Sequence, residues 1–97
     1  DIARMQKKFP QLDEKRAILM AMLRHLDLGV GSVVKKLKDE GFWENTLFFF
    51  LTDNGGAKAM NANNGILRGF KGSLYEGGIR TPWVVSWPAK FSGGRTI

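Results

Sequence analysis

Two polar side chains stand directly behind a short apolar run, and their types suit the binding of a hard metal cation. Residues 47–51 are continuously apolar and rich in phenylalanine, and Asp53 and Asn54 follow them after a single threonine. A short run of this kind favours a strand that is buried on both faces. Ligands of open α/β sheets bind outside the carboxyl ends of strands, where Asp and Asn oxygens can hold calcium or magnesium. We therefore predict that Asp53 and Asn54 are metal ligands.

The same two residues have a simpler interpretation as a turn, because Asn-Gly pairs such as Asn54-Gly55 are common turn formers. A position at the end of a buried strand favours the ligand interpretation, since such a strand is a rigid support. Two side chains do not complete a cation site, so the remaining ligands have to come from elsewhere.

Lys71 is the second candidate, because Gly69 and Gly72 stand close to it in the sequence. Glycines let the backbone approach a bound group, while the ammonium supplies a positive charge and three donors. Phosphate or sulfate oxygens are natural partners for such a lysine. A phosphate-binding P-loop is excluded, because Gly72 separates Lys71 from Ser73. The alternative interpretation is a lysine that only contacts solvent.

Other catalytic chemistries have too few residues to support them. Cysteine is absent and His25 is the one histidine, which excludes disulfides and argues against a multi-histidine zinc site or a Ser-His-Asp triad. We interpret His25 and Asp27 as structural residues of a helix. Glu76 and Arg80 lie four positions apart and are predicted to form a structural ion pair.

The elements that must position these residues follow from periodicity. Apolar residues recur every three or four positions over residues 13–40, which predicts one long amphipathic helix. A buried strand is expected at residues 46–52 and a second short strand at residues 82–88, separated by a Gly- and Asn-rich loop over residues 53–80. This order predicts an α/β fold with part of a mixed or parallel sheet.

Length and charge limit the possible partners. At 97 residues the chain forms one domain at most, and its net charge of +6 favours anionic partners. No recognisable nucleic-acid-binding module is present, and no uninterrupted apolar run reaches the length of a membrane span, so we predict neither nucleic acid binding nor a membrane span. One helix gives the strand too little cover, so either other chains supply the missing layer or the chain is a piece of a larger protein. We favour the second interpretation and expect the uncovered strand of such a fragment to promote self-association.

Four segments in this order resemble the sulfatase family of the alkaline-phosphatase-like superfamily. They are residues 44–47, 52–56, 67–82 and 87–88. The resemblance implies that residues 1–97 form a single incomplete domain with a partial alkaline-phosphatase-like fold, from the C-terminal portion of the large catalytic domain. It also implies that Asp53 and Asn54 are calcium ligands and that Lys71 contacts the sulfate group. The family's formylglycine motif has no match in these residues.

The function implied by the resemblance is a calcium-dependent sulfatase that hydrolyses sulfate esters. Its formylglycine nucleophile would lie outside this chain, so the fragment alone is expected to be inactive. The resemblance further implies a periplasmic, secreted or lysosomal parent protein. Two alternatives stay open: a phosphatase or phosphonate hydrolase of the same superfamily, and a non-catalytic binding module for anionic polymers.

Overall fold

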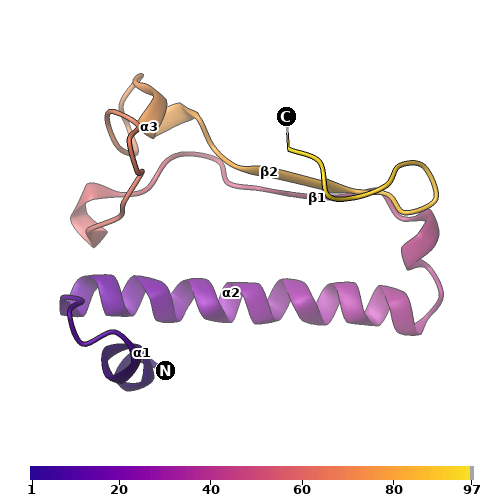
Figure 1. Cartoon of the computed structure of the whole chain (residues 1–97), viewed down its shortest axis with the longest axis horizontal. Coiled ribbons are helices and arrows are strands. Elements are labelled where there is room, and N and C mark those ends of the chain that lie inside the picture. The colour runs from indigo at the N-terminus through magenta and orange to yellow at the C-terminus, as the bar shows by residue number, and fades with distance from the viewer. Residues whose placement is uncertain (97) are drawn as a thin grey trace.

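The protein has two layers, one helical and one that contains a sheet, joined at one end by a short turn (Figure 1). The computed structural model describes residues 1–96. Its elements are, in order, α1 (Ile2–Lys8), α2 (Glu14–Asp39), η1 (Trp43–Asn45), β1 (Phe48–Leu51), η2 (Lys58–Met60), α3 (Glu76–Ile79) and β2 (Trp83–Ser86). The chain runs along α2, turns at η1 and returns through β1 to the loop that carries the candidate residues.

Helix α2 confirms the helix predicted over residues 13–40. The Asp13 side chain accepts a hydrogen bond from the Arg16 N–H at 3.0 Å and so caps the first turn. This hydrogen bond is the main cause that lowers the pKa of the Asp13 carboxyl below its ordinary value of 3.8. At the other end Gly41 adopts a left-handed conformation with φ of 75°, where glycine is favoured and the helix stops.

The two predicted strands are present but shorter than expected, and they pair with each other. Strands β1 and β2 form a two-stranded antiparallel sheet in which Phe48 faces Ser86 and Leu51 faces Trp83. This pairing differs from the mixed or parallel sheet that we expected, since no parallel pair occurs within residues 1–96. The physical reason is that the sequence pattern of a short apolar strand does not set the direction of its neighbour. The loop that joins the strands leaves and re-enters the sheet at the same end of the two strands (Figure 1).

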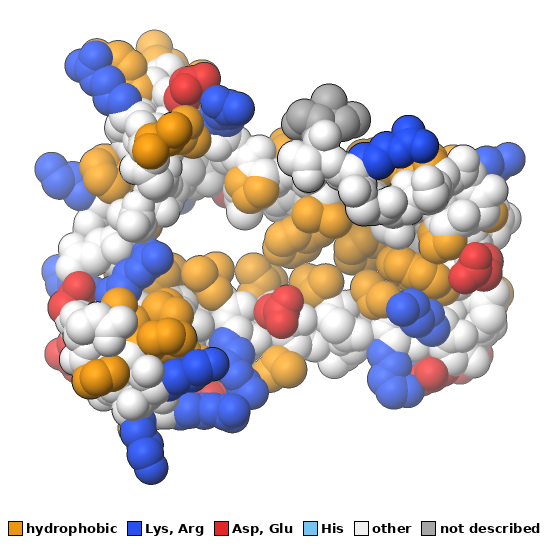
Figure 2. Space-filling model, viewed as in Figure 1, with side chains coloured by type: hydrophobic (Ala, Val, Ile, Leu, Met, Phe, Trp, Pro, Cys, Tyr) orange, Lys and Arg blue, Asp and Glu red, His pale blue; other side chains and the backbone are white. Residues whose placement is uncertain are grey.

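The prediction of a strand buried on both faces is wrong for this chain. Phe48 and Phe50 are half-buried, whereas Phe49 is 51% exposed and Leu51 is 45% exposed. The reason is that, among the described residues 1–96, only α2 faces the sheet and no second layer covers it. Apolar side chains of the two layers gather on the sides that face each other, and much of this surface stays open (Figure 2).

The sequence analysis missed helix α1 and the short helices inside the long loop. The small core lies where α1 meets α2, with Met5, Ala17 and Ala21 buried there. The alanines let the two helices approach closely, but Ala is too weak a hydrophobic signal to predict this contact. Helix α3 has only four residues, too few to show a helical period.

Within residues 1–96, α2 is long and apolar enough to cross a membrane by length and composition alone. Arg24 and Asp27 interrupt the apolar residues of this helix, so no uninterrupted apolar run reaches the length of a span. The absence of a membrane span stays a prediction. Core helices of soluble proteins meet the same criterion, and charged side chains near the middle of a span are costly. Apolar side chains of α2 lie toward the sheet layer (Figure 2).

Candidate functional site

Asp53 and Asn54 directly follow β1, as predicted, and their side chains fit the coordination of a hard cation. Asp53 is exposed and Asn54 is half-buried. The Asn54 Nδ2 donates a hydrogen bond to the Gly55 carbonyl at 2.9 Å, which fixes the orientation of the amide. Its Oδ1 accepts no hydrogen bond from the described residues and is free to act as a ligand. The described part of the chain has no group of three or more His, Cys, Asp or Glu that could complete a metal site.

Glycines pack the end of β1 against α3. The Gly55 N–H donates to the Gly78 carbonyl at 2.9 Å, and both Gly77 and Gly78 are buried. A Cβ added at Gly55 would overlap the Gly77 carbonyl oxygen, and a Cβ at Gly77 would overlap the Gly69 carbonyl oxygen. Only glycine therefore permits this close approach of three backbone segments.

A backbone hydrogen bond holds Lys71 beside the end of β1. The Lys71 N–H donates to the Gly56 carbonyl at 3.0 Å, although 15 positions separate the two residues in sequence. The Lys71 side chain is exposed and forms no ion pair within residues 1–96. Its ammonium is therefore available to an external anion. The structure thus brings the segment of Lys71 and the segment of Asp53 and Asn54 together.

The loop around Lys71 has further internal contacts. The Arg68 guanidinium stacks on the Tyr75 ring at 3.7 Å from its centroid, and the Arg68 carbonyl accepts a hydrogen bond from the Gly77 N–H at 2.7 Å. Both contacts join Arg68, which precedes Lys71, to residues that follow it, and so restrain the backbone of the loop around Lys71.

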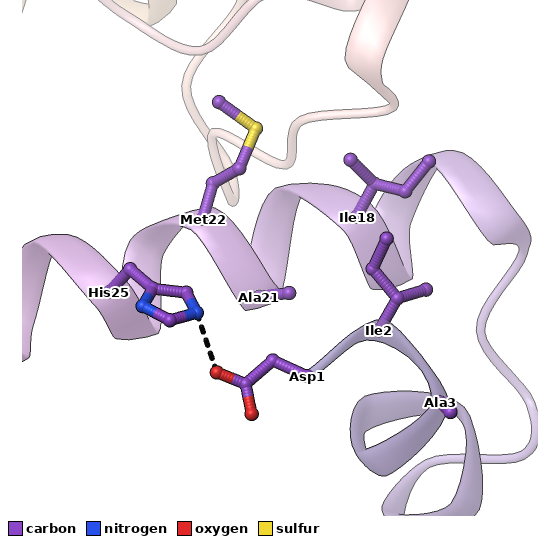
Figure 3. Close-up of a pocket in the computed structure, with 7 residues that line it drawn as sticks. All are labelled: Asp1, Ile2, Ala3, Ile18, Ala21, Met22 and His25. Atoms are coloured by element: carbon purple, nitrogen blue, oxygen red, sulfur yellow. Dashed lines mark ion pairs between the residues drawn. The ribbon is translucent and has the colours of Figure 1, made fainter.

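The residues interpreted as structural have local partners or lie apart from the site. Arg80 pairs with Glu76 at 3.6 Å, which confirms the predicted ion pair, and the exposure of both side chains makes its contribution small. Asp27 is exposed on α2. His25 contacts the Asp1 carboxylate at 2.6 Å across an open hollow between α1 and α2, where the two side chains point toward each other (Figure 3). Helix α1 lies on the side of α2 that faces away from the sheet layer (Figure 1).

Sequence reasoning missed Asn64, whose side chain contacts both parts of the site. Its Oδ1 accepts from the Gly56 N–H at 3.0 Å and its Nδ2 donates to the Gly69 carbonyl at 2.9 Å. Asn64 lies in an Asn-rich stretch that includes Asn61 and Asn63, so its residue type carries no distinguishing signal. Only the tertiary contacts single it out.

Comparison with known proteins identifies relatives of this chain. The sulfatase family model matches residues 3–96. The chain belongs to the sulfatase family. It is 36% identical over 83 residues to steryl-sulfatase of Mus musculus, covering 77% of this chain and 13% of that protein. It is 38% identical over 77 residues to arylsulfatase A of Homo sapiens, covering 76% of the chain and 15% of the relative. N-acetylgalactosamine-6-sulfatase of Canis lupus familiaris is 36% identical over 75% of the chain and 15% of its own length.

A solved structure shares the fold of this sulfatase chain. The crystal structure of Ps i-CgsB in complex with k-i-k-neocarrahexaose matches with a TM-score of 0.80 and 38% sequence identity, over 89% of this chain and 19% of that protein. The predicted α/β, partial alkaline-phosphatase-like fold is confirmed by this match. The uncovered 11% of the chain is smaller than the 26 residues of α2, so at least part of that helix belongs to the shared fold. The chain spans less than a fifth of the proteins it matches.

Proposed function

We propose that residues 1–97 form part of the catalytic domain of a calcium-dependent sulfatase, a hydrolase of sulfate esters. In this proposal Lys71 contacts the sulfate group and Asp53 and Asn54 bind the calcium ion. The observation that carries it is the 3.0 Å hydrogen bond from the Lys71 N–H to the Gly56 carbonyl. This bond holds the backbone of Lys71 close to the segment that follows Asp53 and Asn54. It therefore supports a site in which one anion contacts both the lysine and the bound metal.

The chemistry of each side chain suits a sulfate group. The Lys71 ammonium has three donors and a positive charge, which stabilise the negative charge on sulfate oxygens. The Asp53 carboxylate and the Asn54 Oδ1 are hard oxygen ligands that suit calcium. Calcium, when bound, offsets further charge on the sulfate oxygens. The family resemblance implies that a formylglycine outside residues 1–97 supplies the nucleophile.

The names of the relatives support a role for the candidate residues in binding the sulfate group. Steryl-sulfatase, arylsulfatase A and N-acetylgalactosamine-6-sulfatase have sulfate in common and differ in the group that bears it. The candidate residues suit the common sulfate, because they offer positive charge and cation ligands to its oxygens. We infer that selectivity for the alcohol comes from other parts of the longer polypeptide, which is here called the parent enzyme. We further propose that the parent enzyme is periplasmic, secreted or lysosomal.

The parent enzyme provides the test of this function. We expect it to hydrolyse a chromogenic aryl sulfate, to lose activity with a calcium chelator and to regain it when calcium is added. Asp53→Ala should weaken calcium binding by at least about tenfold, since even changes outside the first coordination shell cost that much. The calcium-dependent rise in Tm reports this change without an activity measurement.

Asp39→Ala is the matched control, because Asp39 is an exposed carboxylate that pairs with Lys35 at the far end of α2. It should leave calcium binding and activity unchanged. A parent enzyme with no sulfate ester hydrolysis would contradict the proposed function. Unaltered calcium dependence in Asp53→Ala would contradict the metal assignment alone. The 97-residue chain without the nucleophile should show no hydrolysis above buffer.

A further inference from the structure

Asn64 joins the two halves of the candidate site with one side chain. Its Oδ1 accepts from the Gly56 N–H, two residues after Asn54, and its Nδ2 donates to the Gly69 carbonyl, two residues before Lys71. We propose that Asn64 is a positioning residue that sets the separation between the cation ligands and the lysine. This role rests on the proposed function of Asp53, Asn54 and Lys71.

The hydrogen bonds around Asn64 form a closed arrangement. Gly56 is held at both of its polar atoms, since its N–H donates to Asn64 and its carbonyl accepts from Lys71. The Asn64 backbone is held as well, because its carbonyl accepts from the Leu67 N–H at 3.2 Å. A shift of the Lys71 segment relative to β1 would therefore break hydrogen bonds of Asn64 and Lys71 together.

The close packing around Gly56 also limits how far the Asn64 side chain can shift relative to the backbone of Gly56. A Cβ at Gly56 would lie 2.5 Å from the Ala62 Cβ, closer than side chains tolerate, and 3.0 Å from the Asn64 Oδ1, which is a tight contact. The Asn64 side chain is also half-buried. Its amide therefore lies against backbone with little free space, and its two hydrogen bonds gain from reduced competition with water.

An amide is the side chain that suits this place, because one end must accept and the other must donate. A carboxylate only accepts, and would put an oxygen against the Gly69 carbonyl. The neighbouring Asn63 makes a contrasting contact. Within residues 1–96 its exposed side chain accepts a hydrogen bond only from the Gly65 N–H, at 2.7 Å and two positions away. Asn63 thus has the residue type of Asn64 without its link between segments.

Hydrogen exchange of the ¹⁵N-labelled chain tests the link without any catalytic activity. Asn64→Ala removes both hydrogen bonds, so protection of the Gly56 and Lys71 amides should fall about tenfold, as for the loss of one net hydrogen bond. The isosteric Asn64→Asp keeps an acceptor for Gly56, so protection should fall at Lys71 and persist at Gly56. Asn63→Ala is the control and should leave both amides unchanged. Unaltered protection of Lys71 in both Asn64 variants would overturn the proposal.

A double-mutant cycle in the parent enzyme separates positioning of the lysine from general support of the loop. Acting through Lys71, Asn64→Asp should lower kcat about tenfold, the effect of one lost hydrogen bond, and should have no further effect in a Lys71→Ala background. An equal loss in both backgrounds would overturn the positioning role. Absence of sulfatase activity in the parent would refute the proposed function, while the hydrogen exchange result would still decide whether Asn64 holds the two segments together.

Discussion

Replacing Lys71 by alanine tests its proposed role directly, because its backbone and its side chain take part in different interactions. The Lys71 N–H donates to the Gly56 carbonyl, and this bond survives the substitution. The side chain is exposed and has no carboxylate partner within residues 1–96. Lys71→Ala therefore removes one positive charge and three donors while the loop keeps its path.

The expected magnitude follows from the charge that the ammonium stabilises. Loss of one preorganised donor to a charged transition state costs about 2.7–4 kcal/mol, which corresponds to a fall of roughly 10²–10³ in kcat. Lys71→Arg keeps the charge but replaces a compact ammonium with a planar fork, so its kcat should lie between those of Lys71→Ala and the wild type. The free energy of unfolding of the parent enzyme should not change, because the substituted side chain is exposed.

The assay is the initial rate of hydrolysis of a chromogenic aryl sulfate by the parent enzyme, with kcat and KM determined separately. Lys35→Ala serves as the control, since Lys35 is an exposed lysine of α2 whose ion-pair partner in the described part of the chain is Asp39 alone. The reasoning is refuted if Lys71→Ala retains wild-type kcat, or if Lys35→Ala loses as much activity as Lys71→Ala.

Three further predictions concern the 97-residue chain itself. Gly55→Ala should lower the free energy of unfolding, because the new methyl group would overlap the Gly77 carbonyl. Gly29→Ala should raise the free energy of unfolding by about 1 kcal/mol, since no described atom lies within 4 Å of the added methyl group and alanine favours the helix. Urea unfolding of both variants measures these opposite changes. The exposed face of β1 should drive self-association at high concentration, and Phe49→Lys should reduce the mass measured by light scattering. Because the pKa of Asp13 is lowered on folding, its carboxylate stabilises the protein at pH values above 3.8, the ordinary pKa, and this stabilisation is lost as the pH falls through the lower folded-state pKa. Helicity followed by circular dichroism should therefore drop in that pH window. The drop should be smaller in Asp13→Asn. A chain that stays monomeric, or an Asp13→Asn variant with an unchanged acid transition, would contradict the respective prediction.

The candidate site shows where sequence reasoning succeeds. Asp53 and Asn54 could be placed at the end of a strand because their position depends only on where a local apolar run stops. Lys71 could be singled out because the glycines near it are local too. Asn64 could not be found in this way, since its importance depends on contacts with Gly56 and Gly69 that the chain makes only after the loop folds.

The sequence by itself determined the long helix, the two strands and the family of this protein. The helix follows from a 3.6-residue period, the cap at Asp13 and the stop at Gly41, all of which act within a few residues along the chain. The family follows from the order and spacing of several motifs.

The tertiary structure alone decided the antiparallel pairing of β1 with β2, the exposure of Phe49 and the approach of Lys71 to the end of β1. Each of these depends on which distant segment lies alongside, and a local pattern of apolar and polar residues does not specify that neighbour. Burial shows the same limit, because an apolar strand is buried only where a second layer covers it.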